Sequence, residues 1–132
     1  MGLNEDLLKN RITYARSCHA AKKLGLEVIK NSLSGCFIGY DRPFQFYINE
    51  EWIANPLKDN LARLFLEPAN LVPISILKGN TAEVANENSK NNILKQINKI
   101  LEQGSEGSFQ VAGALWNNYF GQVLLGNPEA RI

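Results

Sequence analysis

The sequence predicts an α+β fold: one N-terminal helix, a small antiparallel sheet, and three further helices packed on one face, all in a single globular domain, residues 1–132. Apolar residues recur at helical spacing in four stretches, which indicates the helices. Two runs of strand formers flank a proline-bearing turn, which indicates a β-hairpin or meander, and a further apolar run supplies one more strand. Strands and helices do not alternate regularly, so a parallel doubly wound sheet is disfavoured.

The first predicted element is a helix that Asn4 can cap, with two acidic residues in the first turn near the positive end of the helix dipole. Its end has two alternatives. In the favoured one, Lys-Lys-Leu-Gly-Leu terminates the helix at Gly25, and residues 26–30 form a strand. In the other, the helix continues through Gly25 to Leu33, and the glycine costs about 1 kcal/mol. The apolar stripe of this helix consists of Leu8, Ile12, Ala15, Cys18 and Ala21.

A β-hairpin is the most specific local prediction. Its strands are residues 36–40 and 44–48, and the turn between them is Asp-Arg-Pro. In the second strand apolar residues alternate with Gln45 and Tyr47, which gives one apolar face. Pro43 cannot donate to a strand ladder and therefore belongs to the turn or to the start of the strand.

The middle of the chain predicts a helix followed by a strand. Asn55 caps the helix, Pro56 occupies its first turn, and Pro68 bars its continuation. Residues 71–77 are apolar at nearly every position and are predicted to form a short strand. Pro73 within this run favours a position at the edge of the sheet or at a bulge.

Two helices are predicted in the last third of the chain. The first ends at Gln103 and begins at either Thr81 or Ser89, because the polar residues between them carry no apolar stripe. Residues 109–125 are read as a second helix, and the alternative is a hairpin that turns at residues 117–118. The final seven residues are expected to form a frayed tail.

Composition narrows the functional classes. The chain has 14 basic and 13 acidic residues and a net charge of +1, which is not the electrostatic signature of a nucleic-acid-binding protein. It lacks the apolar core of a signal peptide and an apolar run long enough to span a membrane, so we expect a cytoplasmic protein that does not bind membranes. Its two cysteines lack CxxC spacing and are expected to be structural rather than part of a disulfide framework.

No catalytic or metal-binding motif is recognisable, which leaves enzymatic activity uncertain and disfavoured. The GxSxG, HExxH, Walker and GxGxxG patterns are absent. His19, the one histidine, follows Cys18, and on a helix the two side chains point about 100° apart, so they do not form a nucleophile–base pair. No cofactor or metal ion is predicted.

The sequence therefore favours a non-enzymatic regulatory or adaptor protein that acts through contacts with a protein partner or through self-association as a homodimer. Candidate binding residues lie at the hairpin turn, just after it, and in the last helix: Tyr40, Asp41, Arg42, Trp52, Trp116 and Tyr119. The alternative is a module that binds a small ligand in an apolar pocket between sheet and helices. That pocket would be lined by Phe44, Phe46, Trp52 and Trp116.

Overall fold

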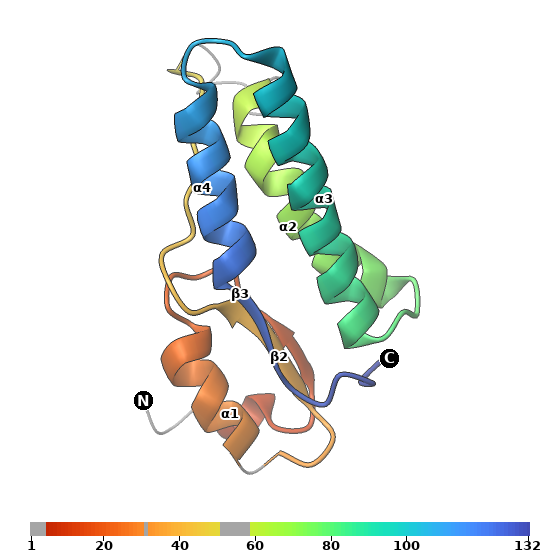
Figure 1. Ribbon diagram of the computed structural model, residues 1–132. Helices are drawn as coiled ribbons and strands as arrows, with labels where there is room; N and C mark the ends of the chain where they lie inside the picture. The colour runs from red at the N-terminus through yellow and green to blue at the C-terminus, as the bar shows by residue number, and fades with distance from the viewer. Residues whose placement is uncertain (1–4, 31, 51–58) are drawn as a thin grey trace.

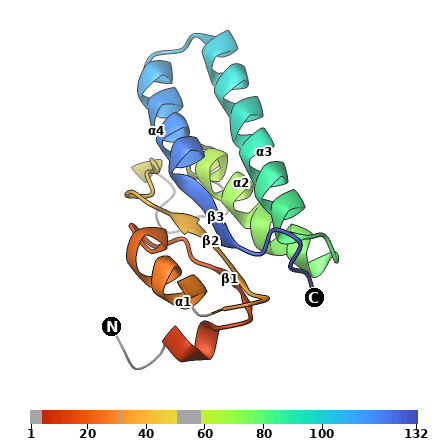
Figure 2. The same cartoon turned by 60° about the horizontal axis from the view of Figure 1, so that its bottom comes forward.

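The computed structural model describes residues 5–30, 32–50 and 59–132. It has an α+β fold in which a three-stranded sheet lies beside a bundle of three long helices (Figures 1 and 2). No helix in these described ranges has the length and apolar character needed to cross a membrane.

The sheet is mixed rather than antiparallel. Its order is β1 (Ile12–Tyr14), β2 (Cys36–Tyr40) and β3 (Gln122–Gly126), with β1 parallel and β3 antiparallel to the central strand. The prediction that residues 44–48 form the second strand of a hairpin is wrong. The place beside β2 is taken by β3, from the far end of the chain, and Tyr40 lies opposite Gln122.

Both faces of β2 are covered, and all five of its residues are buried. Cys36 and Ile38 pack on one side against residues of α2 (Asn60–Leu77) and α3 (Ala82–Gln103). Phe37 packs on the other side against the N-terminal helical segment. The strand therefore lies between two layers, as its nearly continuous apolar sequence requires.

The long N-terminal helix is a wrong prediction. A short 3-10 turn, Glu5–Leu8, is followed by β1, and the helical segment begins only at Ala21. Asn10 and His19 have positive φ angles of 58° and 60°, which interrupt an α-helix on either side of β1.

The prediction of a strand at residues 26–30 is also wrong, because a π-helical turn, Ala21–Gly25, continues directly into α1 (Leu26–Lys30). The alternative in which the helix passes through Gly25 is confirmed as far as Lys30. Gly25 was expected to terminate the helix, but it has a different role. A Cβ at this position would lie 2.8 Å from Cδ1 of Phe37, so the glycine allows the helix to approach the sheet closely.

The helix α2 contradicts two predictions, because it runs through Pro68 and includes the whole predicted strand 71–77. Pro68 and Val72 are buried in the core, and the packing of this long apolar face outweighs the cost of about 3 kcal/mol per interior proline. Asp59 caps the helix and accepts a hydrogen bond from the Ala62 N–H at 2.9 Å. The predicted cap, Asn55-Pro56, lies outside the described residues.

Both C-terminal helices are confirmed. Thr81 caps α3 through its hydroxyl, which confirms the earlier of the two predicted starts. Residues Ser108–Gly121 form α4, so the hairpin alternative is wrong, although the chain continues from residue 122 as β3.

The tail is not frayed. The Ala130 carbonyl accepts a hydrogen bond from the Ala82 N–H at 2.8 Å, and the Pro128 carbonyl accepts one from the Glu83 N–H at 2.9 Å. The last residues thus satisfy backbone donors at the start of α3.

Candidate functional site

The outer face of α4 is the most distinctive surface of the molecule. The helix has 14 residues and no charged side chain. Four of its exposed residues, which we call the outer stripe of α4, follow one another at spacings of four, three and four: Phe109, Gly113, Trp116 and Phe120. Phe109 is 83% exposed, Trp116 36% and Phe120 58%. Apolar residues on a helix normally face the core, so this stripe needs a separate explanation.

The opposite side of α4 fixes this orientation. Ala112 and Leu115 are buried in a cluster with Phe65 of α2 and with Ile93 and Ile97 of α3. Since one helix turn holds 3.6 residues, burying positions 112 and 115 directs the outer stripe away from the bundle. The stripe therefore faces outward because the fold already uses the other side of the helix.

The aromatic rings at the C-terminal half of α4 pack against one another. Trp116 and Phe120 are stacked, with ring centroids 5.4 Å apart and an interplanar angle of 19°. The Tyr119 ring meets both edge-on, at 5.5 and 5.3 Å. Each such contact holds its partners in a defined arrangement, so the exposed rings form a preorganised surface.

Lys90 of α3 supports this aromatic group from the side of the bundle. Its ammonium nitrogen lies 4.6 Å from the centroid of the Tyr119 ring and donates a hydrogen bond to the Gln122 carbonyl at 3.2 Å. Burial lowers the pKa of the Lys90 ammonium, and the charge of Asp41 acts in the opposite direction. Tyr119 is thus half-buried between α3 and the outer stripe.

Gly113 separates Phe109 from Trp116 within the outer stripe. A Cβ at Gly113 would meet no atom within 4 Å, so packing inside the described chain does not require a glycine there. At Gly121, in contrast, a Cβ would lie 2.7 Å from Cγ of Arg42. The absence of a side chain at Gly113 leaves the helix backbone open to close approach from outside.

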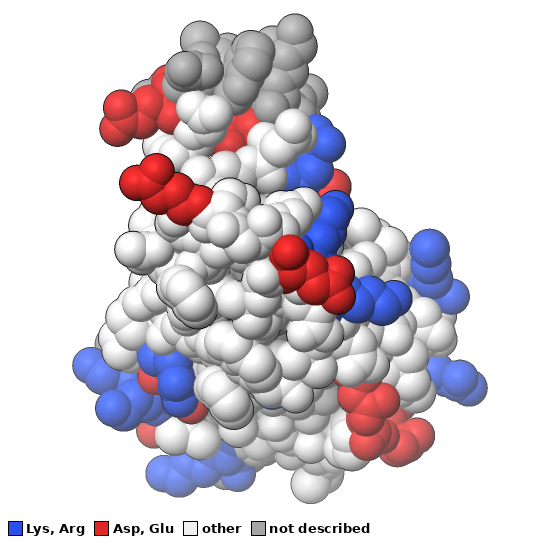
Figure 3. Space-filling view, turned by 45° about the horizontal axis from the view of Figure 1, so that its top comes forward, with Lys and Arg blue, Asp and Glu red and all other residues white. Residues whose placement is uncertain are grey.

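The exposed side of α3 provides a comparison within the same molecule. It carries charged residues along its length: Glu83, Glu87, Lys95, Lys99 and Glu102. In Figure 3 uncharged atoms cover most of the middle of the view, and charged groups lie mainly toward its edges. A charged helix face is an ordinary solvated surface, whereas the outer stripe of α4 is not.

Tyr40 lies in the interior rather than at a surface turn. Its hydroxyl donates a 3.0 Å hydrogen bond to Oε1 of Gln122, and burial raises the pKa of its phenol. Oε1 of Gln122 also accepts from the Ser89 hydroxyl at 3.3 Å, and its Nε2 donates to Asn86 at 2.8 Å. This buried polar network joins β2, β3 and α3, so Tyr40 has a structural place here.

Asp41 and Arg42 lie at the C-terminal end of α4. Nε of Arg42 is 2.9 Å from Oδ1 of Asp41, and the Asp41 N–H donates to the Gly121 carbonyl at 3.0 Å. The Arg42 side chain lies over Gly121, where a cation is favoured by the negative end of the helix dipole. The pair thus borders the end of the outer stripe. Trp52, the remaining predicted residue, lies outside the described residues.

The thiols differ in environment. Cys36 is buried in β2, and burial raises the pKa of its thiol to about 11, so it is a poor nucleophile at neutral pH. Cys18 is exposed, and Nδ1 of the adjacent His19 lies 3.2 Å from the Asp41 carbonyl oxygen.

Within the described part of the chain, no group of three His, Cys, Asp or Glu side chains is arranged to hold a metal ion.

Two residues of the predicted apolar pocket, Phe44 and Phe46, are neighbours, with ring centroids 6.3 Å apart. Phe44 packs edge-on against Tyr40, with ring centroids 5.0 Å apart, while Phe46 is exposed. Trp116 belongs to the outer stripe of α4.

Trp116 and Tyr119 were predicted as binding residues, whereas Phe109 and Gly113 were not among the predicted binding residues. The usable signal was the absence of charge over the whole length of α4, which is unusual for a helix with an exposed side. Comparison with protein-family models, curated proteins and solved structures finds no match for this chain.

Proposed function

We propose that the protein is a non-enzymatic adaptor or regulatory protein that binds a protein partner through the outer stripe of α4. The observation that carries this proposal is the exposure of three aromatic side chains on a helix that has no charged residue. Buried interface centres are enriched in aromatic residues and depleted in charged ones, which is the composition of this stripe.

The size of the stripe fits the centre of an interface. With aromatic side chains of about 200 to 250 Å², the exposed fractions of Phe109, Trp116 and Phe120 amount to about 350 Å². Each side of a standard protein interface covers roughly 800 Å², and its energy is concentrated in a few central residues. Gln110 and Asn117 beside the stripe provide amide groups suited to a polar rim.

The partner chemistry follows from the shape of the stripe. Two aromatic groups flank Gly113, where the helix backbone is accessible, so a partner can place one protruding apolar side chain between them. An amphipathic helix with apolar residues at i, i+3, i+4 and i+7 presents such side chains along a matching line. We therefore assign an apolar helix of another protein as the partner surface.

A displayed library of helical peptides, selected against the whole protein, tests this assignment. Selected peptides are expected to carry the i, i+3, i+4, i+7 apolar pattern and to bind Phe120→Ala at least tenfold more weakly than the wild type, as for a central interface residue. Leu101→Ala is the matched control, because Leu101 is an exposed apolar residue on α3. Failure to select any peptide, or equal losses in the two variants, would refute the proposal.

A further inference from the structure

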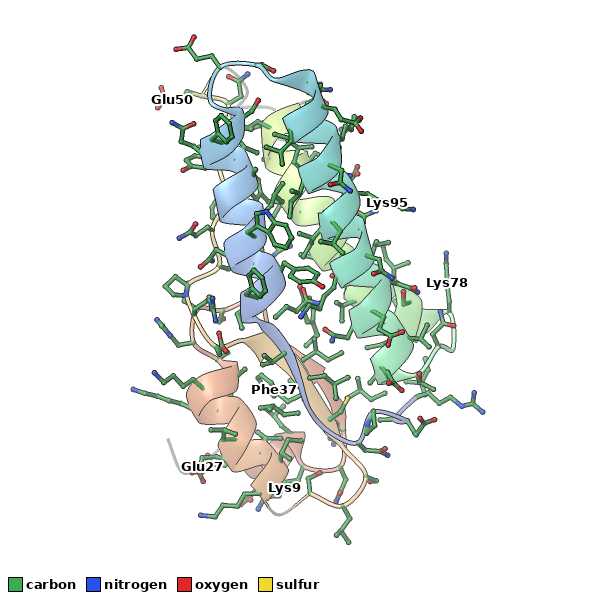
Figure 4. The ribbon with its side chains drawn as sticks, in the orientation of Figure 1. Lys9, Glu27, Phe37, Glu50, Lys78 and Lys95 are labelled. Atoms are coloured by element: carbon green, nitrogen blue, oxygen red, sulfur yellow. The ribbon has the colours of Figure 1, made fainter. Side chains whose placement is uncertain are left out.

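A polar groove runs along α2 and α3, and no residue of α4 lines it. It consists of two adjoining hollows of about 460 and 550 Å³. The first is lined by residues within 60–67 and 96–103, and the second by residues within 71–80 and 88–95. In each helix the lining positions recur at helical spacing, so they share one face. Figure 4 shows Lys78 and Lys95, which line the second hollow, pointing away from α4.

Two side-chain amides at the junction of the hollows have oxygens without a partner. Oδ1 of Asn92 and Oε1 of Gln96 are buried, and no described group donates a hydrogen bond to either. A buried acceptor that stays unpaired costs about 1–3 kcal/mol. The torsion that orients a terminal amide is soft, so each amide turns toward the groove when a donor arrives there. The groove thus holds two acceptors for which the described part of the fold supplies no donor.

These amides belong to a row on α3 whose spacing matches an extended peptide. Asn88, Asn92 and Gln96 follow one another every four residues, so each step along the helix is about 6 Å. Two residues of an extended chain advance by about 6.6 Å, and alternate residues turn their N–H and C=O groups to the same edge. Successive amides therefore meet alternate residues of one peptide edge. From residue 88 to residue 103 the helix rises about 22 Å, which gives room for about seven extended residues.

The chain already contains a helix-borne amide that binds a backbone in this way. In α4, Oδ1 of Asn118 accepts from the Gln45 N–H at 2.9 Å, and Nδ2 of Asn118 donates to the Gln45 carbonyl at 2.7 Å. Gln45 lies in no helix or strand. One asparagine side chain thus satisfies both backbone groups of a residue that has no partner in a sheet, and a row of such amides is suited to a longer segment of this kind.

The charges along the groove select an acidic segment. Lys78 at the end of α2 lines it together with Lys95 and Lys99 of α3, and none of the three forms an ion pair with a described residue. Among the described lining residues the one carboxylate is Glu67, which lies 3.5 Å from Nε of Arg63. The glutamates of α3 line neither hollow. Lys95 and Lys99 are also four residues apart, so they meet acidic side chains at alternate positions of an extended chain.

We propose that this groove binds an extended acidic segment of a partner protein. The oxygens of Asn92 and Gln96 accept hydrogen bonds from backbone N–H groups of alternate residues of the segment, and Lys95 and Lys99 pair with its carboxylates. The proposal goes beyond the function assigned to the outer stripe of α4, because it uses a different surface and a partner of different chemistry.

Fluorescence anisotropy on the whole protein tests the groove, with a labelled peptide in which glutamate alternates with serine as the probe. Asn92→Leu and Lys95→Glu are each expected to weaken binding about tenfold. Asn98→Leu and Lys30→Glu are the matched controls, because both residues are exposed and line neither hollow. Asn92→Leu removes an unpaired buried oxygen, so its free energy of unfolding is expected not to fall, and urea denaturation thereby separates a lost contact from a lost fold.

Peptides that are N-methylated at alternate residues test the backbone contacts. Methylation of one set, the glutamates or the serines, is expected to weaken binding about tenfold, and methylation of the other set less than about threefold, because only one set of N–H groups faces the amides. Equal effects of the two sets overturn the proposal, as does a wild type that does not bind the peptide or binds it no better than Asn92→Leu does. Displacement of the peptide by a single-stranded oligonucleotide of the same charge and concentration also overturns it, and makes the groove a site for polyanions.

Discussion

Substitution of Gly113 by alanine tests whether the outer stripe of α4 is free of intramolecular packing. Gly113 lies inside a regular helix, and a Cβ there would meet no atom within 4 Å. Glycine within a helix is about 0.5–1 kcal/mol less favourable than alanine, because it has more backbone freedom to lose. Gly113→Ala is therefore expected to raise the free energy of unfolding by that amount, and Tm by about 2–5 °C for a chain of this size.

Gly25→Ala is the matched control, since Gly25 is also helical. There a Cβ would lie 2.8 Å from Cδ1 of Phe37 and 3.0 Å from Cδ1 of Leu125, so overpacking is expected to outweigh the gain in helix propensity. Urea denaturation followed by circular dichroism measures both variants. If Gly113→Ala destabilises the protein, or if both variants change stability in the same direction, the assignment of Gly113 to an open surface is refuted.

The same position separates folding from binding. Gly113→Leu adds a side chain between Phe109 and Trp116, and because its Cβ would meet no atom within 4 Å, the fold is expected to remain stable. Affinity for a peptide selected against the outer stripe is expected to fall at least tenfold, because the partner loses its close approach to the helix. Isothermal titration calorimetry provides the measurement, and unchanged affinity would contradict the proposed contact.

Four further predictions concern other parts of the structure. Ser89→Ala removes a buried donor from the polar network and is expected to lower the free energy of unfolding by about 1–3 kcal/mol in urea titration; a change within error would contradict the network. A thiol reagent at pH 8 is expected to modify Cys18 in the folded protein and Cys36 only after unfolding. Because the thiol of Cys36 ionises near pH 9 in the unfolded chain and near 11 when folded, its contribution to stability is complete below pH 9 and is lost as the pH rises to about 11, which pH-dependent unfolding measures. Asn118→Leu removes the side-chain oxygen that accepts from the Gln45 N–H and is expected to speed amide exchange at Gln45. Unchanged exchange would show that Asn118 does not protect this amide.

The helices that the sequence predicted correctly depend on local signals. Thr81 caps α3 through its own side chain, and Gly104 at its end adopts the left-handed conformation with φ of 61°. The aromatic spacing of α4 likewise lies within one helix. Such features are set by residues a few positions apart, and the sequence displays them directly.

The errors share a different cause, which is competition from distant residues. Residues 44–48 have the composition of a strand, yet β3 occupies the place beside β2. Pro68 ends a helix by local rules, but burial of α2 against α3 outweighs those rules. No local pattern indicates whether residues 44–48 or β3 will pair with β2.

The candidate site was predictable in part. Trp116 and Tyr119 were identified from their residue type, but the choice of the exposed side of α4 depends on which side meets Phe65 and the core of the bundle. Tyr40 was expected at a surface turn and is buried, because the strand that it ends is covered on both faces.

The central place of β2 has a consequence for how the chain folds. Tyr40 and Gln122, which are hydrogen-bonded through their side chains, are separated by 82 positions, and closing a loop of that length costs about 4 kcal/mol of chain entropy. The contacts among α2, α3 and α4 are shorter in range, so the bundle is expected to form first. Until β3 pairs with β2, the edge of β2 that β3 will occupy stays unpaired and apolar. A growing chain on the ribosome therefore carries this vulnerable strand through most of its synthesis, and a chaperone that shields it would speed productive folding.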